Sequence, residues 1–311
     1  MTATATATAP QTPTTQADIE RHQRRERWVR RLPLLPALLI TIVITQVPFL
    51  FSLYYSFTDW TVVPPSPREF VGFENYIGLI SDRFFLDAAW VSVLMTVGAV
   101  LLSLMLGTAI AVLLDRQFFG RGFVRTLLIT PFLVMPVVAG LLWRTQMFSS
   151  LFGVLNWVLE AVGLQSVAFV QQAPLGTIVT VLVWQWTPFM MLIVLAGLQG
   201  QDPSILEAAE VDGAKPMAVF RQITLPHLRP FLELGTLLGS IYLVQVFDHI
   251  EVMTGGGPGS TNIPYFVFQR SIGGGWRFGD ASAYAVVVVL ASIIIAVFSL
   301  RVLSGLLEDR V

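Results

Sequence analysis

The sequence of 311 residues contains no cysteine and little charge. Without cysteine, the chain has no disulfide framework, no thiol chemistry and no cysteine-based metal site. Charged residues make up 13% of the chain, whereas a soluble globular domain carries about 25%. Hydrophobic residues make up 54%, and the mean hydropathy is +0.70. These values exclude an ordinary soluble domain and predict a protein that crosses a membrane several times.

The residues that enzyme chemistry requires are also scarce. The three histidines, His22, His227 and His249, lie far apart in the sequence and lack the spacing of metal ligands. No G-x-x-x-x-G-K-[ST] motif is present, and the one lysine, Lys215, is followed by proline, which excludes it from a phosphate-binding loop. We therefore expect no catalytic residue, no metal and no cofactor on this chain. A membrane-embedded enzyme would need clustered His, Asp or Glu residues at membrane depth, and these are missing here.

Six apolar stretches are long enough to cross about 30 Å of hydrocarbon, which takes about 20 residues of helix. The first four contain no charged side chain, and Pro131, Pro136 and Pro188 are expected to kink the third and fourth. The predicted fold class is an all-α polytopic membrane protein with six transmembrane helices in a domain at 32–304. The predicted spans are 32–57, 88–114, 126–143, 174–199, 231–252 and 281–304.

The distribution of basic residues predicts the orientation. With six crossings both termini lie on one side, and 14 of the 19 basic residues fall on that side. Because positive charge stays cytoplasmic, both termini and the loop at 202–230 are predicted to face the cytoplasm. Residues 1–31 are predicted to be a disordered and then arginine-rich tail, and 305–311 a second cytoplasmic tail. The arginine run is more typical of membrane topology than of nucleic-acid binding, so no nucleic-acid partner is expected.

Two segments on the opposite side have recognisable patterns. Residues 146–170 carry apolar side chains close to helical spacing, which predicts an amphipathic helix lying at the outer interface. The glycine-rich run at 254–259 follows the fifth span and predicts a tight extracytoplasmic turn.

A polar island at 202–230 separates two long apolar segments. Asp202 can cap a helix that opens with a proline, where the missing N–H costs nothing. Gly213 can end that helix, because only glycine turns the backbone there without a Cβ penalty. Pro216 can then open a second short helix, which is expected to end before Leu225. The island therefore predicts a rigid helix–turn–helix at the mouth of a membrane segment.

This island resembles the EAA loop of binding-protein-dependent ABC importer permeases. The family pattern is roughly E-A-A-x-x-D-G-A-x(5)-F-x-x-I-x-L-P-x-x-x-P. Gly153 and Asn156 also fit a G-x-x-N region of this family, and the run at 254–259 is similar to a Gly-Gly-Pro turn of its sugar-type branch. That branch includes the maltose and glycerol-3-phosphate permeases and the mycobacterial trehalose importer permeases. The pattern is matched at Glu207, Ala208, Ala209, Asp212, Gly213, Ala214, Phe220, Ile223, Leu225, Pro226 and Pro230.

The resemblance implies a permease of the bacterial cell membrane that forms the path for a sugar, such as the disaccharide trehalose. It implies a second permease subunit as a heterodimer partner, membrane lipid around both, and an extracytoplasmic sugar-binding protein or lipoprotein. Two ATPase subunits would bind ATP and magnesium, and Glu207 would form a salt bridge to one of them. The implied ATPase-coupling residues are Glu207, Ala208, Ala209, Asp212, Gly213, Ala214, Leu225 and Pro226.

Polar groups inside the predicted spans mark the candidate substrate path. Tyr242, Gln245 and Asp248 recur at intervals of three in the fifth span, and Trp184 and Gln185 lie side by side in the fourth. Sugars need hydrogen-bond partners for their hydroxyls and aromatic faces for their C–H surfaces, and these residue types supply both. Lipid contact or packing is the alternative for Trp184, and an interfacial position is the alternative for Asp248.

A self-sufficient secondary transporter or channel for a small polar solute is the alternative function. Such a protein would need intramembrane ionisable residues for ion coupling, and usually an inverted repeat. The first four predicted spans contain no ionisable residue, and no repeat is evident in the sequence.

Overall fold

The computed structural model describes residues 34–308, with all of their side chains except those of 295, 296 and 298–308. It divides into two compact units, Met1–Tyr54 and Tyr55–Val311, and each is described by itself. The predicted tail at 1–31 lies outside the described residues. The last helix continues to Glu308, into the segment that we predicted as the C-terminal tail, and residues 309–311 lie outside the described range.

The first unit is built on one apolar helix, α2 (Leu35–Tyr55). Its 21 residues span about 31 Å at 1.5 Å per residue, which matches the hydrocarbon thickness of a bilayer. The hydroxyls of Thr41, Thr45 and Ser52 each donate to the carbonyl four residues earlier, at 2.8, 2.8 and 3.1 Å. These hydrogen bonds satisfy the polar side chains within the helix, as an apolar surrounding requires.

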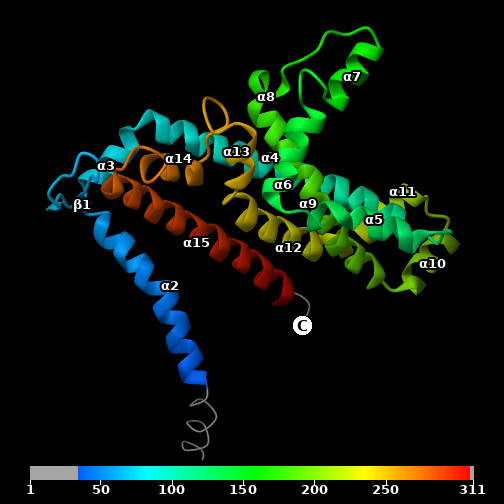
Figure 1. Cartoon of the computed structure of the whole chain (residues 1–311). Helices are drawn as coiled ribbons and strands as arrows, with labels where there is room; N and C mark the ends of the chain where they lie inside the picture. The colour runs from blue at the N-terminus through cyan, green and yellow to red at the C-terminus, as the bar shows by residue number, and fades with distance from the viewer. Residues whose placement is uncertain (1–33, 309–311) are drawn as a thin grey trace, which may run out of the picture. The chain divides into compact units, whose positions relative to one another are not determined.

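The core of the second unit is the pair of long helices α4 (Arg83–Asp115) and α9 (Pro174–Gln199), which have the most extensive contact between any two elements (Figure 1). A small residue makes this approach possible. A Cβ at Gly107 would lie 2.8 Å from both Met190 Cβ and the backbone nitrogen of Met191. Helix α12 (Leu225–Leu243) packs against both members of the pair. Close packing through small residues is the usual substitute for hydrophobic burial inside a membrane.

Two of the predicted spans are broken. The stretch predicted at 126–143 consists of α5 (Arg121–Leu133) and α6 (Pro136–Leu142), bent by 98°. Proline at the start of α6 lacks an N–H and restricts the residue before it to extended backbone, so the chain leaves the first helix and starts a second. The stretch predicted at 231–252 is likewise divided between α12 and α13 (Asp248–Met253).

By length and composition, the described residues contain three helices able to cross a membrane, α2, α4 and α9. The number rises to four when the bent pair is counted as one span. The predicted span at 174–199 coincides with α9. The mostly helical class is therefore confirmed, whereas six spans with both termini in the cytoplasm stay a prediction.

Among the other elements, α3 (Glu74–Ser81), α14 (Ile263–Arg270) and the start of α15 (Phe278–Glu308) lie together near the N-terminal end of α4 (Figure 1). A two-stranded antiparallel sheet pairs Thr58 with Phe70 and Asp59 with Glu69 at the end where α4 begins. The remaining elements are β1 (Thr58–Asp59), β2 (Glu69–Phe70), the π-helix η2 (Trp143–Met147), α7 (Val154–Ala161), α8 (Phe169–Gln172), α10 (Pro203–Val211), α11 (Pro216–Val219) and the π-helix η3 (Phe220–Thr224).

The segment predicted as one amphipathic helix at 146–170 contains two short helices, α7 and α8, separated by a loop. Buried Asn156 holds the loop in place. Its side-chain amide donates to the carbonyls of Ser149 and Val167, both at 3.0 Å, and its oxygen accepts from the Val167 N–H at 2.8 Å. In a single continuous helix over 146–170 the Asn156 amide would lose these backbone partners. The hydrogen bonds of Asn156 therefore favour the loop between α7 and α8.

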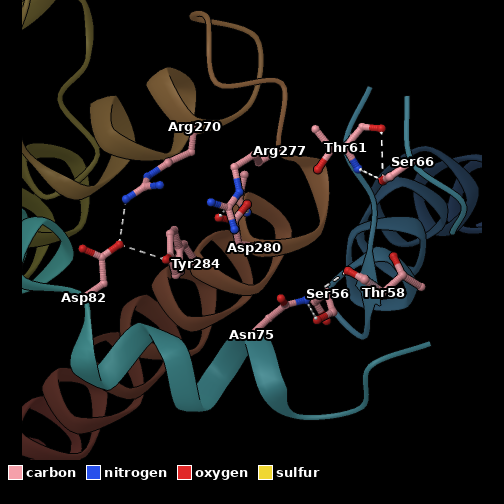
Figure 2. Close-up of polar contacts among 11 residues, drawn as sticks. Ser56, Thr58, Thr61, Ser66, Asn75, Asp82, Arg270, Arg277, Asp280 and Tyr284 are labelled. Carbon is pink, nitrogen blue, oxygen red and sulfur yellow. Dashed lines mark hydrogen bonds and ion pairs between the residues drawn. The ribbon is translucent and has the colours of Figure 1, made fainter. Parts of the chain in front are cut away.

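Asp82 joins three helices at the end of the unit where α4 begins (Figure 2). Its Oδ1 caps α4 by accepting from the N–H of Phe84 at 2.9 Å. Its Oδ2 accepts from Arg270 Nη2 of α14 at 2.8 Å and from the Tyr284 hydroxyl of α15 at 3.1 Å. The half-buried carboxylate therefore combines a helix cap with an ion pair.

We predict that Asp82→Ala destabilises the protein. The change removes a cap worth about 1 kcal/mol and hydrogen bonds to charged groups worth about 1.5–3 kcal/mol each. Thermal unfolding of the detergent-purified chain should therefore show a clear loss of stability. Asp87→Ala is the matched control, because Asp87 is an exposed carboxylate on the same helix with no ion pair among the described residues. Equal midpoints for the two variants would contradict the prediction.

Candidate functional site: a polar loop and a cavity at two helix breaks

The predicted helix–turn–helix begins as expected. The carboxylate of Asp202 accepts from the N–H of Ser204 at 3.0 Å and caps α10. This backbone hydrogen bond lowers the pKa of Asp202, because it stabilises the ionised carboxylate. Gly213 has a φ of +74° and ends the helix. The N–H groups of Gly213 and Ala214 donate to the carbonyls of Glu210 and Ala209, both at 3.0 Å, which is the Schellman arrangement.

The second half of the loop differs from the prediction. Helix α11 begins at Pro216 and ends at Val219, but the helical backbone does not stop before Leu225. The chain passes through the π-helix η3 directly into α12, whose first turn contains Pro226. The π-turn has wider hydrogen bonds than an α-helix, so a new α-helical segment begins after it. Pro226 lies in the first turn of that segment, where a missing N–H costs no hydrogen bond. The loop is therefore continuous with α12, without a break in the helical backbone.

The exposed surface of the loop combines acidic and apolar side chains. Glu207 and Glu210 are exposed, and neither has an ion pair among the described residues. Val211 is 89% exposed and Met217 is 74% exposed. Ala208, Asp212, Leu225 and Pro226 are exposed, whereas Ala209 and Ala214 are half-buried. Exposed apolar side chains beside unpaired carboxylates are typical of a surface that binds another protein.

Both helix breaks leave backbone carbonyls that need new partners. Val134 and Met135 between α5 and α6 are extended, with ψ values of 134° and 137°. The carbonyl of Val134 accepts from Gln185 Nε2 of α9 at 2.6 Å. The carbonyl of Val246, between α12 and α13, accepts from Asn262 Nδ2 at 2.5 Å. In an apolar surrounding these side-chain amides stabilise backbone that is not helical.

A cavity of about 470 Å³ lies where the two breaks meet α9. It combines an indole, three phenyl rings and a phenol with amide, carboxylate and imidazole groups. The rings of Trp186 and Tyr242 are tilted with centroids 5.6 Å apart, and Phe132 stacks on Phe189 at 5.3 Å. The lining residues are Phe132, Val134, Pro136, Gln185, Trp186, Phe189, Tyr242, Gln245, Val246, Phe247, Asp248 and His249.

Four of the five residues predicted for the substrate path lie together in this lining, namely Gln185, Tyr242, Gln245 and Asp248. Trp184 does not. Its ring packs against Trp143 at 5.7 Å within the apolar core, which is the packing alternative considered above. Tyr242 and Asp248, predicted to recur on one helix, lie on two, because α12 ends at Leu243 and Asp248 starts a new helix. The break, rather than helical spacing, brings these side chains to one cavity.

Sequence reasoning overlooked two buried residues that shape the cavity. They are His249, whose spacing from the other histidines excludes only a metal site, and Asn262, which no sequence pattern marks. A histidine inside a long apolar stretch is itself a signal of function, and could have been followed. Among the described residues, no three His, Asp or Glu side chains are grouped so that they could hold a metal ion.

Comparison with known proteins assigns the family. Residues 103–311 match the model of the binding-protein-dependent transport system inner membrane component family. This match covers more than half of the chain, so the protein belongs to that family and is a membrane transport subunit rather than an enzyme. The predicted resemblance to the sugar-type permeases of ABC importers is confirmed by the relatives described next.

Several curated relatives are similar along most of their length. The chain is 38% identical over 241 residues to a probable ABC transporter permease protein, y4oQ, of Sinorhizobium fredii, covering 77% of this chain and 78% of the relative. It is 33% identical over 274 residues to the trehalose/maltose transport system permease protein MalF of Thermococcus litoralis, covering 86% and 92%. It is 29% identical over 279 residues to the trehalose transport system permease protein SugA of Mycobacterium tuberculosis, covering 88% and 89%.

Solved structures show the same fold. A chain of a bacterial alginate ABC transporter, crystallised in complex with an alginate pentasaccharide-bound periplasmic protein, superposes with a TM-score of 0.75. The sequence identity is 21%, and the superposition covers 92% of this chain and 96% of that one. The architecture is therefore that of an ABC importer permease.

We predict that Asn262→Leu destabilises the break between α12 and α13. The change leaves the buried Val246 carbonyl without its partner, which costs about 1–3 kcal/mol. Hydrogen exchange of the backbone around 244–250 should become faster in the purified protein. Asn156→Leu is the control, because it removes an equally buried amide whose bonds lie within 149–167. Unchanged exchange at the break in Asn262→Leu would contradict the prediction.

Proposed function

We propose that this permease forms a translocation path for a neutral sugar, a disaccharide such as trehalose. The observation that carries the proposal is the cavity at the two helix breaks, which combines aromatic faces with amide, phenol and carboxylate groups. Aromatic rings cover the C–H surfaces of a sugar, and the polar groups match its hydroxyls. A volume of about 470 Å³ falls within the usual range for small-molecule sites, about 300–1,000 Å³.

The charge of the cavity favours an uncharged solute. Asp248 lies in its wall, and neither lysine nor arginine is among the lining residues. A phosphate or carboxylate in the cavity would meet a like charge without a compensating cation, which is costly at low dielectric. Trehalose and maltose, for which two of the relatives are named, therefore fit this site better than the anion sn-glycerol-3-phosphate, for which another similar permease is named.

The loop at 202–230 is the proposed contact with the ATPase subunits. The Schellman turn at Gly213 fixes its first helix, and the loop presents Glu207 and Glu210 unpaired beside exposed apolar side chains. A basic pocket on a partner surface would complement these carboxylates. The sequence contains no phosphate-binding loop, so ATP and magnesium belong on the partner. The proposed coupling residues are Glu207, Ala208, Ala209, Asp212, Gly213, Ala214, Leu225 and Pro226.

The proposed assembly pairs this chain with a second permease, two ATPase subunits and an extracytoplasmic sugar-binding protein. The alginate transporter crystallised with a periplasmic protein supports the last partner. The basic-residue distribution supports a cytoplasmic position for the loop and both termini. Family membership argues against the alternative of a self-sufficient secondary transporter or channel.

Reconstitution tests the proposal directly. The tagged chain is purified in a mild detergent from its own membranes, co-purifying subunits are identified, and the assembly is placed in proteoliposomes. We expect a second permease and a P-loop ATPase to co-purify, and uptake of labelled trehalose or maltose to require ATP and the binding protein. Recovery of the chain alone, or uptake that is independent of ATP, would contradict the proposal.

Gly213→Val should uncouple the assembly without preventing membrane insertion. A β-branched residue at a φ of +74° carries a strain of about 1–2 kcal/mol, so the turn between α10 and α11 should change its angle. We expect loss of ATPase co-purification and of uptake. Gly163→Val is the matched control, since Gly163 has a φ of +82° and open space around it but lies outside the loop. Normal uptake in Gly213→Val would contradict a coupling role.

A further inference from the structure

Gln185 connects the two helix breaks through α9. Its side chain is 4% exposed and lies near the middle of this helix. The amide nitrogen donates to the Val134 carbonyl at the break between α5 and α6, at 2.6 Å. The amide oxygen lies 2.8 Å from Nε2 of His249, in the first turn of α13 after the second break. One buried side chain thus contacts both discontinuities that form the cavity.

The two hydrogen bonds of Gln185, to Val134 and to His249, form a relay in which the donor and the acceptor of each bond can be assigned. A carbonyl oxygen can only accept, so the Gln185 atom facing Val134 is the NH₂ group. The Gln185 oxygen therefore faces His249, and His249 Nε2 must donate the proton. In the neutral imidazole this leaves Nδ1 as an acceptor, on a residue that lines the cavity. Gln185 therefore fixes the tautomer and the ring orientation of His249.

Beyond the breaks, α6 and α13 are held to each other. A Cβ at Gly140 would collide with the Val252 side chain, so these helices approach as closely as glycine allows. Arg144 Nη1 donates to the Val252 carbonyl at 2.7 Å. Among the described residues, no side-chain hydrogen bond other than those of Gln185 connects α9 to α13 or to the start of α6. Apolar side chains also pack α9 against this pair, but Gln185 supplies the side-chain hydrogen bonds between them and so fixes their register.

We propose that Gln185 is a positioning residue, which clamps both helix breaks to α9 and thereby sets the shape of the cavity wall. It acts through the Val134 carbonyl and through His249, whose ring it orients towards the cavity. The transport part of this inference rests on the proposed function, whereas the clamp itself concerns the conformation of the chain alone.

The clamp is tested first without any solute. Since the chain has no cysteine, Val134→Cys introduces one reporter thiol in the cavity wall at the first break, with little change in size. In the full assembly, Gln185→Leu should raise the labelling rate of this thiol about tenfold, as expected when a buried hydrogen bond that holds the break is lost. Thr187→Val is the matched control, since its buried hydroxyl donates only to the Val183 carbonyl of the same helix.

The second test uses uptake by the same reconstituted assembly. Gln185→Leu should raise the KM for the sugar about tenfold, with a smaller change in maximal rate, because the cavity wall loses its defined shape. A merely structural defect would lower the amount of active protein and leave KM unchanged. His249→Leu should reproduce the rise in KM, and His249→Gln, which retains a donor, should restore part of it. The double variant, with Gln185→Leu and His249→Leu together, should have a KM no higher than that of Gln185→Leu alone, because both changes break the same relay.

The outcomes separate the clamp from the proposed function. Faster labelling together with a raised KM in Gln185→Leu supports the inference. Wild-type labelling and KM in Gln185→Leu would overturn it, even though the wild-type assembly imports sugar. If the wild-type assembly imports no sugar, the proposed function fails, and the labelling rate of the reporter thiol alone decides whether Gln185 is a clamp.

Discussion

Every backbone carbonyl that leaves a helix inside a membrane must find another hydrogen-bond donor, and this constraint organises the second unit. The chain breaks two helices at the cavity and supplies a buried amide for each, Gln185 for Val134 and Asn262 for Val246. An unsatisfied carbonyl in hydrocarbon costs several kcal/mol. Non-helical backbone at these points is therefore stable only because both amides are in place. The cavity exists where this arrangement interrupts the packing of α9 against its neighbours.

The same architecture offers a physical connection between the loop and the cavity. From Pro216 to Leu243 the chain is helical without interruption through α11, η3 and α12. At 1.5 Å per residue this segment spans about 40 Å, which exceeds the hydrocarbon thickness of a bilayer. His227 contacts the Gly197 carbonyl at 3.0 Å, and so ties the beginning of α12 to the end of α9. In the proposed account, a displacement of the loop by an ATPase would move α12 and the break at its far end.

Much of this fold follows from patterns that operate over a few residues. Asp202 before a proline gives the start of α10, and Gly213 gives its end, because capping and left-handed backbone are local properties. The apolar run at 174–199 gives α9 with its bounds, since length and composition suffice for an uninterrupted span. The EAA pattern indicates the family because its fixed positions are closely spaced in the sequence, and the family match confirms that assignment.

The breaks were beyond sequence reasoning because they depend on distant partners. Nothing near Leu243 in the sequence marks the end of α12, and the amide that stabilises the break comes from Asn262. Pro131 and Pro136 indicated a kink, but not that Gln185 would hold the carbonyl between them. Trp184 and Trp186 lie two residues apart on α9 and therefore face different sides of it, and only tertiary packing decides that the side of Trp186 lines the cavity.

The proposed coupling requires that α11, η3 and α12 move as one rigid helix, so that the loop and the cavity move together. Spin labels on cysteines introduced at Met217 and Tyr242, both exposed, would measure this by double electron–electron resonance in the assembled transporter. A rigid helix gives one narrow distance distribution, centred at roughly 38 Å for a rise of 1.5 Å per residue, and this distribution is the same with and without ATP. A distribution that broadens or shifts by several ångströms when ATP binds would show that the helix bends between the two sites, and would contradict the account.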